Sequence, residues 1–262
     1  MIKLIASDID GTLIDSKHQL PEDFGYVLDK LNERGITFAL SSGRSYNALA
    51  RQFAEYDGKL SFISDNGAYV VHDGKAIGIS PMKKYDCCVI AEYAQKLGIL
   101  VLFCGMKGTY YCTKNDKFEE EINRYYNTCT RIDDISLCRD EILKLAVYNP
   151  NGIENDGYDK LILKFGNDFN VLLSGKNWCD IMNKDVSKGE GMKLLQQCVG
   201  ADYNNSMAFG DYLNDVDMLE NAYYSFAVEN AHKLCKQAAN FTTESNDHHP
   251  VTMEIRKLIP MD

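Results

Sequence analysis

The sequence predicts an α/β fold, a doubly wound parallel sheet into which an α+β segment is inserted. Two observations predict the sheet: strand-like and helix-like patterns alternate over residues 1–81, and the alternation resumes from residue 186. A third predicts the insertion, because residues 82–185 change to a mixture of hairpins and helices. At 262 residues the chain is long enough for two compact units. We therefore expect a discontinuous core, 1–81 with 186–262, and an inserted domain at 82–185.

The first third of the chain shows the alternation most clearly. Apolar residues three and four apart over residues 24–31 predict an amphipathic helix. Asp73-Gly74, between two short apolar runs, is typical of a hairpin turn. In order, we expect a strand at 2–6, a helix around 24–31, a strand at 36–40, a helix around 46–53, a strand at 61–64, and a hairpin from 68–71 and 76–79.

The remaining elements follow from the same patterns. Within the insertion we expect helices at 85–97 and 117–127, and strands at 99–104, 109–113, 143–148, 170–174 and 178–182. After the insertion we expect a helix at 189–199, a strand at 206–209, a helix at 213–221, a strand at 225–228 and a terminal helix at 251–258. Strands that alternate with helices favour a parallel sheet covered on both faces.

The motif Asp8-Ile9-Asp10-Gly11-Thr12, directly after the first apolar run, carries the most chemical information. In an extended segment Asp8 and Asp10 project to the same side, beyond the strand's carboxyl end, where open α/β sheets bind ligands. Two convergent carboxylates repel, so this site needs a cation, a proton, or both. Gly11 permits a sharp turn and Thr12 offers a hydroxyl to hold it. The pattern suits one carboxylate attacking phosphorus, its neighbour moving a proton, and a divalent metal screening the charges.

Three further motifs follow at predicted strand ends or helix starts. They are Ser41-Ser42-Gly43-Arg44, Val186-Ser187-Lys188-Gly189 and Gly210-Asp211-Tyr212-Leu213-Asn214-Asp215. Two shorter signatures accompany them, Ser64-Asp65-Asn66-Gly67-Ala68 and Asp180-Ile181-Met182. With the first motif, they make residues 1 to about 230 resemble the haloacid dehalogenase-like hydrolases, specifically the Cof-type sugar-phosphatase branch. The resemblance implies a Rossmann-like core and a C2-type cap at 82–185 that selects the substrate.

The resemblance assigns the central chemistry to Asp8, Asp10 and Asp211. It implies that Asp8 is the nucleophile and Asp10 the general acid and base. It also implies that Mg²⁺ is held by the Asp8 carboxylate, the Asp10 main-chain carbonyl and Asp211, which suits the oxygen ligands that Mg²⁺ prefers. Without the other motifs, a helix N-cap would be the favoured interpretation of Asp211, and the alternative for Asp10 is a turn-capping aspartate.

The phosphate contacts are assigned in the same way. Ser42 and the Gly43 amide lie where a strand meets a helix, a natural anion cradle. Lys188 opens a predicted helix, where its ammonium opposes the helix dipole. A nearby phosphate and two carboxylates would offset that cost and stabilise developing charge. A solvated lysine is the alternative.

Other residues near these motifs receive supporting roles. The resemblance implies that Asn214 contacts phosphate, while Asp215 braces the metal site or Lys188. Asn66 is expected at the edge of the site, although Asn-Gly is also an ordinary turn. We interpret Asp217 and Glu220 as the exposed surface of a helix.

The sequence departs from the family pattern in two loops. Glu229-Asn230-Ala231 stands where relatives have Gly-Asn-Ala, and Asp247-His248-His249-Pro250-Val251 replaces an acidic-Gly-Val run. The adjacent histidines His248 and His249 suggest a metal site, but neighbouring side chains in a loop rarely converge on one ion. Arg44 suits phosphate, an acidic neighbour or solvent, and receives no role.

The composition of the chain disfavours some classes of binding partner. A formal net charge of −10 and a pI near 5.0 disfavour nucleic acid and anionic membranes. No basic-then-apolar leader or membrane-length apolar run is visible. The nine cysteines form no CxxC pair, which favours reduced thiols and a cytoplasmic protein.

We therefore expect a Mg²⁺-dependent phosphatase that hydrolyses a small phosphorylated metabolite, most plausibly a sugar phosphate, through an aspartyl phosphate. A phosphotransferase or phosphomutase that uses the same intermediate is one alternative. A binding or regulatory module that has lost turnover is another, although such a protein would be expected to lose Asp8, Asp10 or Lys188 first. A dinucleotide-binding protein is disfavoured, because no GxGxxG follows the first strand.

Overall fold

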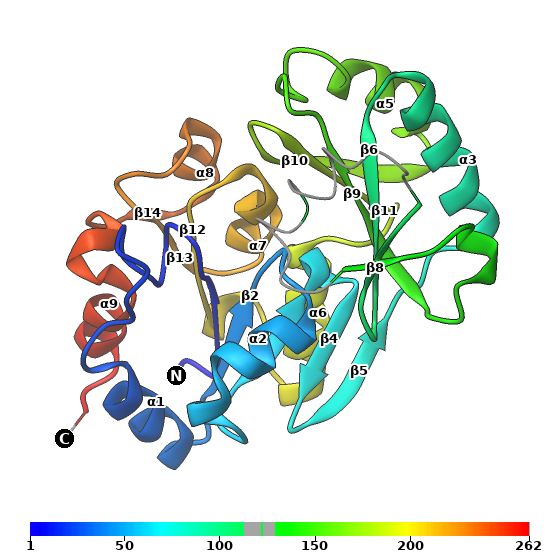
Figure 1. Ribbon diagram of the computed structural model, residues 1–262. Helices are drawn as coiled ribbons and strands as arrows, with labels where there is room; N and C mark the ends of the chain where they lie inside the picture. Colours follow the sequence, from blue (N-terminus) through cyan, green and yellow to red (C-terminus); the bar gives the residue numbers. More distant parts are fainter. Residues whose placement is uncertain (113–121, 123–128, 262) are drawn as a thin grey trace. The chain divides into compact units, whose positions relative to one another are not determined.

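The computed structural model describes residues 1–112, 122 and 129–261, which form two compact units (Figure 1). One unit comprises Met1–Ile79 and Ser187–Asp262, and the other Ser80–Val186. Apart from Ile122, the helix expected at 117–127 lies outside the described residues. The nine cysteines carry free thiols. In the described part of the chain, every helix is too short or too polar to cross a membrane.

The first unit is built on a sheet whose described strands run in the order β14-β13-β12-β1-β2-β3-β4-β5. Pairing is parallel from β14 to β3 and antiparallel for the hairpin β4–β5. The strands are β1 (Leu4–Asp8), β2 (Thr37–Ser41), β3 (Ser61–Ser64), β4 (Tyr69–His72), β5 (Lys75–Ile79), β12 (Ser206–Gly210), β13 (Tyr224–Ala227) and β14 (Phe241–Thr242).

Helices cover both faces of this sheet because its strands are apolar on both sides. In β1, Ile5 packs into the cluster that includes α1 and α9, whereas Leu4 and Ala6 pack into the cluster that includes α6 and α7. The helices are α1 (Phe24–Glu33), α2 (Tyr46–Gln52), α6 (Lys188–Val199), α7 (Val216–Glu220), α8 (Lys233–Ala238) and α9 (Pro250–Leu258). The alternating pattern thus produces the expected doubly wound layers.

The second unit is an α+β structure. Its described strands follow the order β10-β11-β9-β6-β7-β8 and pair antiparallel except for β7 with β8. Residues of α3 and α5 pack with inward-facing residues of the sheet such as Phe103 and Leu145. The elements are α3 (Lys84–Lys96), β6 (Leu100–Gly105), β7 (Thr109–Tyr111), β8 (Cys129–Arg131), β9 (Ile142–Tyr148), α5 (Tyr158–Phe165), β10 (Phe169–Gly175) and β11 (Trp178–Asn183).

The sequence prediction misses short elements and misjudges one helix. The strands β8 and β14 and the helices α5 and α8 were not expected, because each offers too few periodic positions to be seen. The helix expected at 213–221 begins instead as a 3₁₀ turn, Leu213–Asp215, and becomes α-helical only at Val216. The tight turn lets the Asp215 carboxylate reach back to the end of β12.

Candidate active site

Neighbouring parallel strands bring the first, second and fourth motifs to one edge of the sheet. β1 lies between β2 and β12, and Asp8 is in register with Ser41. The residues that follow these strands therefore meet beyond their carboxyl ends, the usual ligand site of open α/β sheets. Lys188, the first residue of α6, extends into the same place from a different element.

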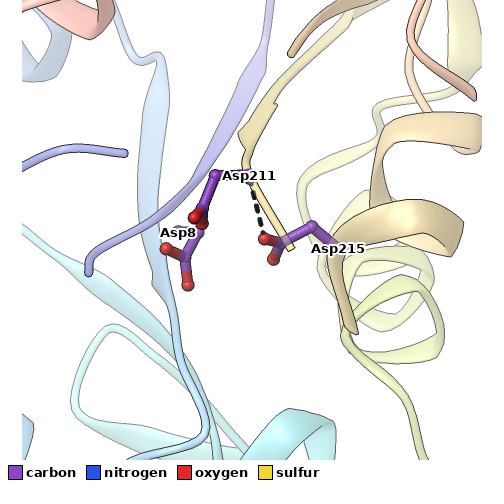
Figure 2. Close-up of side chains that lie close together, drawn as sticks. All are labelled: Asp8, Asp211 and Asp215. Carbon is purple, nitrogen blue, oxygen red and sulfur yellow. Dashed lines mark hydrogen bonds between the residues drawn. The ribbon is translucent and has the colours of Figure 1, made fainter. Parts of the chain in front are cut away.

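Three carboxylates converge there, those of Asp8, Asp211 and Asp215 (Figure 2). Each offers an oxygen atom within 4.8 Å of the others. The Lys188 Nζ lies 2.6 Å from Asp8 Oδ1 and 2.6 Å from Asp215 Oδ1. Only 1% of Lys188 is exposed, so the alternative of a solvated lysine does not hold.

Burial and neighbouring charge shift the pKa values of this cluster. Burial alone would lower the pKa of Lys188, but the Asp215 and Asp8 carboxylates outweigh it and hold that pKa above its ordinary value. Burial raises the pKa of Asp8 well above its ordinary value, although the Lys188 charge opposes the rise. One ammonium therefore does not fully compensate the carboxylates packed around it.

Asp211 is positioned by the first motif rather than by a helix. Its Oδ1 accepts a hydrogen bond of 3.2 Å from the Thr12 hydroxyl, which was expected to hold its own turn and instead holds Asp211. Gly11 has a φ of +85°, and a Cβ there would lie 2.7 Å from Asp211 Oδ2. Burial and the Asp215 charge raise the pKa of Asp211 to about 6.

Asp215 caps the turn that follows β12. Its Oδ2 accepts hydrogen bonds from the backbone amides of Asp211 and Tyr212, at 3.0 and 3.1 Å, while its Oδ1 accepts from Lys188. Its side chain has no exposed surface. Protein donors therefore occupy both Asp215 oxygens, which suits a bracing residue better than a metal ligand.

The donor set fits a divalent cation. Asp8 Oδ2 is buried and has no hydrogen-bond partner among the described residues, although an ionised oxygen in such a place needs compensation. Burial, and after it the neighbouring carboxylates, raises the pKa of both Asp8 and Asp211, which a bound cation would offset. Carboxylate oxygens are the ligands that Mg²⁺ prefers. Asp8 and Asp211 each offer a carboxylate oxygen to such an ion, and the Asp10 main-chain carbonyl stays a predicted ligand.

The Asp10 side chain points elsewhere. In the described chain its carboxylate does not belong to the cluster of Asp8, Asp211 and Asp215 that could hold a metal ion. Its Oδ1 instead lies 2.5 Å from Arg44 Nη2. The Arg44 Nη1 donates a hydrogen bond of 2.7 Å to Gln52 Oε1 on α2. Arg44, which had no role from the sequence, thus pairs with an acidic neighbour, and Asp10 does not cap its own turn with that oxygen.

The second motif and the loop after β3 form one network. The buried Ser42 accepts a hydrogen bond from the Arg44 amide through its Oγ, at 3.2 Å, and its carbonyl accepts one from the Asn66 amide at 3.0 Å. Asn66 Oδ1 accepts from Asn214 Nδ2 at 3.0 Å. A Cβ on Gly43 would lie 3.2 Å from Asn66 Oδ1. Ser42, Gly43, Asn66 and Asn214 are therefore neighbours in space.

The interpretation of Asp217 as helix surface is wrong. Its Oδ2 accepts a hydrogen bond of 3.1 Å from the Gly189 amide, at the start of α6. Burial raises the pKa of Asp217. Its carboxylate therefore supplements the N-cap Ser187 and offsets the positive end of the helix that carries Lys188. Glu220, by contrast, is exposed as expected.

Asparagines in or beside the two departing loops bond to the first motif and to the residues that follow it. Asn230 Nδ2 donates to the Gly11 carbonyl at 2.8 Å, and Asn246 Nδ2 donates to the Ile14 carbonyl at 2.9 Å. His248 and His249 belong to no metal-binding group of three or more ligands in the described chain. His248 lies 3.2 Å from Glu244, and His249, at a φ of 54°, precedes α9.

Comparison with known proteins decides the family. The model of the haloacid dehalogenase-like hydrolases matches residues 5–255. The chain belongs to this family. Within it, the chain is a Cof-type phosphatase, a phosphoric monoester hydrolase, so the resemblance of its motifs is confirmed.

Individual relatives agree over nearly the whole length. The 5-amino-6-(5-phospho-D-ribitylamino)uracil phosphatase YbjI of Escherichia coli K12 is 28% identical over 98% of this chain and 96% of its own. The crystal structure of SMU.1108c from Streptococcus mutans UA159 is 25% identical, with a TM-score of 0.90 over 99% of both chains. The subclass IIB sugar phosphatase BT4131 shares the fold, with a TM-score of 0.83 at 20% identity, over 99% of this chain and 100% of its own. This hydrolase therefore has a Rossmann-like core with an inserted C2-type cap, as predicted.

Proposed function

We propose that this hydrolase is a Mg²⁺-dependent phosphatase that cleaves small phosphomonoesters, most plausibly sugar phosphates, through a phosphorylated Asp8. The observation that carries the proposal is the environment of Asp8. One of its oxygens is held by a buried lysine, and the other is buried without a partner in the described chain. That arrangement fixes the carboxylate and leaves one oxygen for a cation or a substrate.

In the first half-reaction, Asp8 attacks phosphorus and displaces the alcohol or sugar oxygen. Asp10 is the acid that protonates this departing oxygen. Lys188 stays between Asp8 and Asp215 and stabilises the negative charge that develops on the phosphoryl group. Ser42, the Gly43 amide and Asn214 bind the phosphoryl oxygens.

In the second half-reaction, water attacks the phosphorus of the aspartyl phosphate and Asp10 removes its proton. Inorganic phosphate leaves and the Asp8 carboxylate is regenerated. Asp8, the Asp10 carbonyl and Asp211 would hold Mg²⁺, which would supply Lewis-acid charge so that a carboxylate can approach a phosphate dianion. Asp215 positions Lys188 and the loop that carries Asp211.

We assign substrate choice to the inserted unit, 82–185 by sequence, acting as a cap. The name of the Escherichia coli relative describes a phosphate ester on a ribityl chain. A polyol phosphate of that kind falls within the substrate class proposed here. Each cap contact that favours one ester over another is worth about 1–3 kcal/mol. The free thiols suit a reducing compartment, so we place the enzyme in the cytoplasm.

A turnover screen tests this function. The purified protein is incubated with a panel of phosphorylated metabolites, with Mg²⁺ and after exhaustive chelation, and released phosphate is measured. We expect Mg²⁺-dependent release from sugar or polyol phosphates. Transfer of the phosphoryl group to a sugar acceptor in place of water would indicate the phosphotransferase or phosphomutase. No turnover of any ester, including an aryl phosphate, would indicate a regulator.

A further inference from the structure

The Asp10 side chain lies outside the acidic cluster of Asp8, Asp211 and Asp215, and its partner Arg44 has no part in the mechanism above. Arg44 Nη2 lies 2.5 Å from Asp10 Oδ1, and the other terminal nitrogen of Arg44 is held by Gln52. The guanidinium is therefore fixed at both nitrogens, one on a helix residue and one on the carboxylate. The Asp10 carboxylate is bound to the described chain through its Oδ1.

We propose that Arg44 is a positioning residue for Asp10. It holds the side chain in one rotamer in which Oδ1 is bound and Oδ2 faces the departing oxygen of the substrate. The proposal rests on the acid and base role proposed for Asp10. It gives the arginine of the second motif a function that is separate from phosphate binding.

The two oxygens of the Asp10 carboxylate have different roles in proton transfer. When Asp8 forms its bond to phosphorus, the ester P–O bond breaks and the proton on Asp10 Oδ2 passes to the departing oxygen. In the hydrolytic step, water forms the new P–O bond, its proton passes to Oδ2, and the bond between phosphorus and Asp8 breaks. Oδ1 stays with Arg44 throughout, so the carboxylate need not rotate between the two steps.

The Arg44–Asp10 ion pair adds little to the stability of the fold, which agrees with a positioning role. The side chains of Arg44 and Asp10 are 39% and 45% exposed, and ion pairs in such places contribute about 0–1 kcal/mol to stability. A planar guanidinium held at two points nevertheless restricts orientation, which an ammonium cannot do as well. Loss of Arg44 should therefore change the chemistry of proton transfer with little change in stability.

Two aryl esters of nearly equal shape separate these effects. The 4-nitrophenolate ion leaves readily without a proton, whereas the phenolate ion depends more on an acid. The value of kcat/KM for each ester reports only the steps up to formation of the aspartyl phosphate. The ratio of the two values therefore measures how well the acid works.

The variants are Asp10→Asn, Arg44→Gln, Arg44→Lys and Arg51→Gln. Arg51 is the matched control, since it is an exposed arginine of α2 that, among the described residues, donates to the Asn47 carbonyl of its own helix. We expect Asp10→Asn to lower kcat/KM for phenyl phosphate about 100-fold more than for 4-nitrophenyl phosphate. Arg44→Gln should lower kcat/KM for phenyl phosphate about tenfold more than for 4-nitrophenyl phosphate. Arg44→Lys should show a smaller bias than Arg44→Gln, and Arg51→Gln should show none.

The outcomes distinguish the two proposals. If Asp10→Asn shows no bias between the esters, the acid role of Asp10 is wrong. If Asp10→Asn shows the bias but Arg44→Gln matches Arg51→Gln, only the role of Arg44 is wrong. Equal losses for both esters in Arg44→Gln, with a lower Tm, would show a structural role and overturn the proposal. Should Arg44→Gln not fold, Gln52→Leu removes the group that orients the Arg44 guanidinium. This variant must then lose more kcat/KM for phenyl phosphate than for 4-nitrophenyl phosphate, by a smaller factor.

Discussion

The Lys188 ammonium and the Asp215 carboxylate form an ion pair of 2.6 Å in which neither side chain is exposed to solvent. The same ammonium lies 2.6 Å from Asp8. Buried charges are costly unless they are paired and fully hydrogen-bonded, and Asp215 meets that condition through two backbone amides. The pair therefore sets the geometry of the nucleophile.

Replacement of Lys188 by Ala should destabilise the protein as well as inactivate it. Two buried carboxylates would lose their shared counter-charge, and removal of one partner of a buried pair costs about 3–5 kcal/mol. Urea unfolding measures this loss. The control is Lys193→Ala on the same helix, an exposed lysine whose ion pair is with the exposed Glu190, and it should change stability by less than about 0.5 kcal/mol. Equal stability of the two variants would contradict the account.

Chelation should abolish turnover, and added Mg²⁺ should restore it. Asp211→Ala should raise the Mg²⁺ concentration that is needed and lower the maximal rate, because Thr12 holds this carboxylate beside Asp8 and Gly11 leaves room for it. The measurement is the rate as a function of Mg²⁺, with the exposed Glu220→Gln as a control that should behave as wild type. Full activity after exhaustive chelation would rule out the metal.

Asp217→Ala should lower the free energy of unfolding by about 1 kcal/mol, the usual cost of a lost helix cap. Asp217→Asn keeps an acceptor for the Gly189 amide and should retain most of that stability. Thermal unfolding of both variants, with Glu220→Ala from the same helix as control, measures the difference. If Asp217→Ala and Glu220→Ala unfolded at the same temperature, the cap would contribute nothing.

Gly67→Ala should be far more harmful than Gly200→Ala. Both glycines have positive φ, +97° and +65°, so each alanine carries a backbone cost of about 1–2 kcal/mol. At Gly67, however, the new Cβ would also lie 2.0 Å from the Ser187 carbonyl oxygen, whereas Gly200 has no atom within 4 Å. The difference in unfolding free energy between the variants measures the close approach of this loop to the start of α6. A difference of zero would mean that the backbone moves aside without cost.

The sequence predicts the alternating core because the central strands consist of apolar residues, as Leu4, Ile5 and Ala6 do in β1. It also indicates which loops carry the chemistry, since the motifs follow the strands directly. It does not predict short elements such as α5, whose helical face consists of little more than Leu161 and Phe165. Tertiary packing decides such elements, not local pattern.

The contacts within the site are predictable only in part. Asp215 was expected to support Lys188, and the two are in contact. The capping of α6 by Asp217 joins residues that are 28 positions apart, and the link from Asn230 to Gly11 spans 219. A helical pattern says which face a residue occupies, but not which distant backbone amide lies opposite. The partner of Arg44 was left open for the same reason.

The central claim is that Asp8 becomes phosphorylated during turnover, and acid quenching tests it most directly. The enzyme is mixed with a phosphomonoester and Mg²⁺, quenched within its first turnovers, digested, and analysed by mass spectrometry beside Asp8→Asn. We predict one phosphoryl group on the peptide that contains Asp8 in the wild type and none in the variant. The variant should also fold normally and lose nearly all activity. Turnover by Asp8→Asn within a few-fold of the wild type would contradict the account.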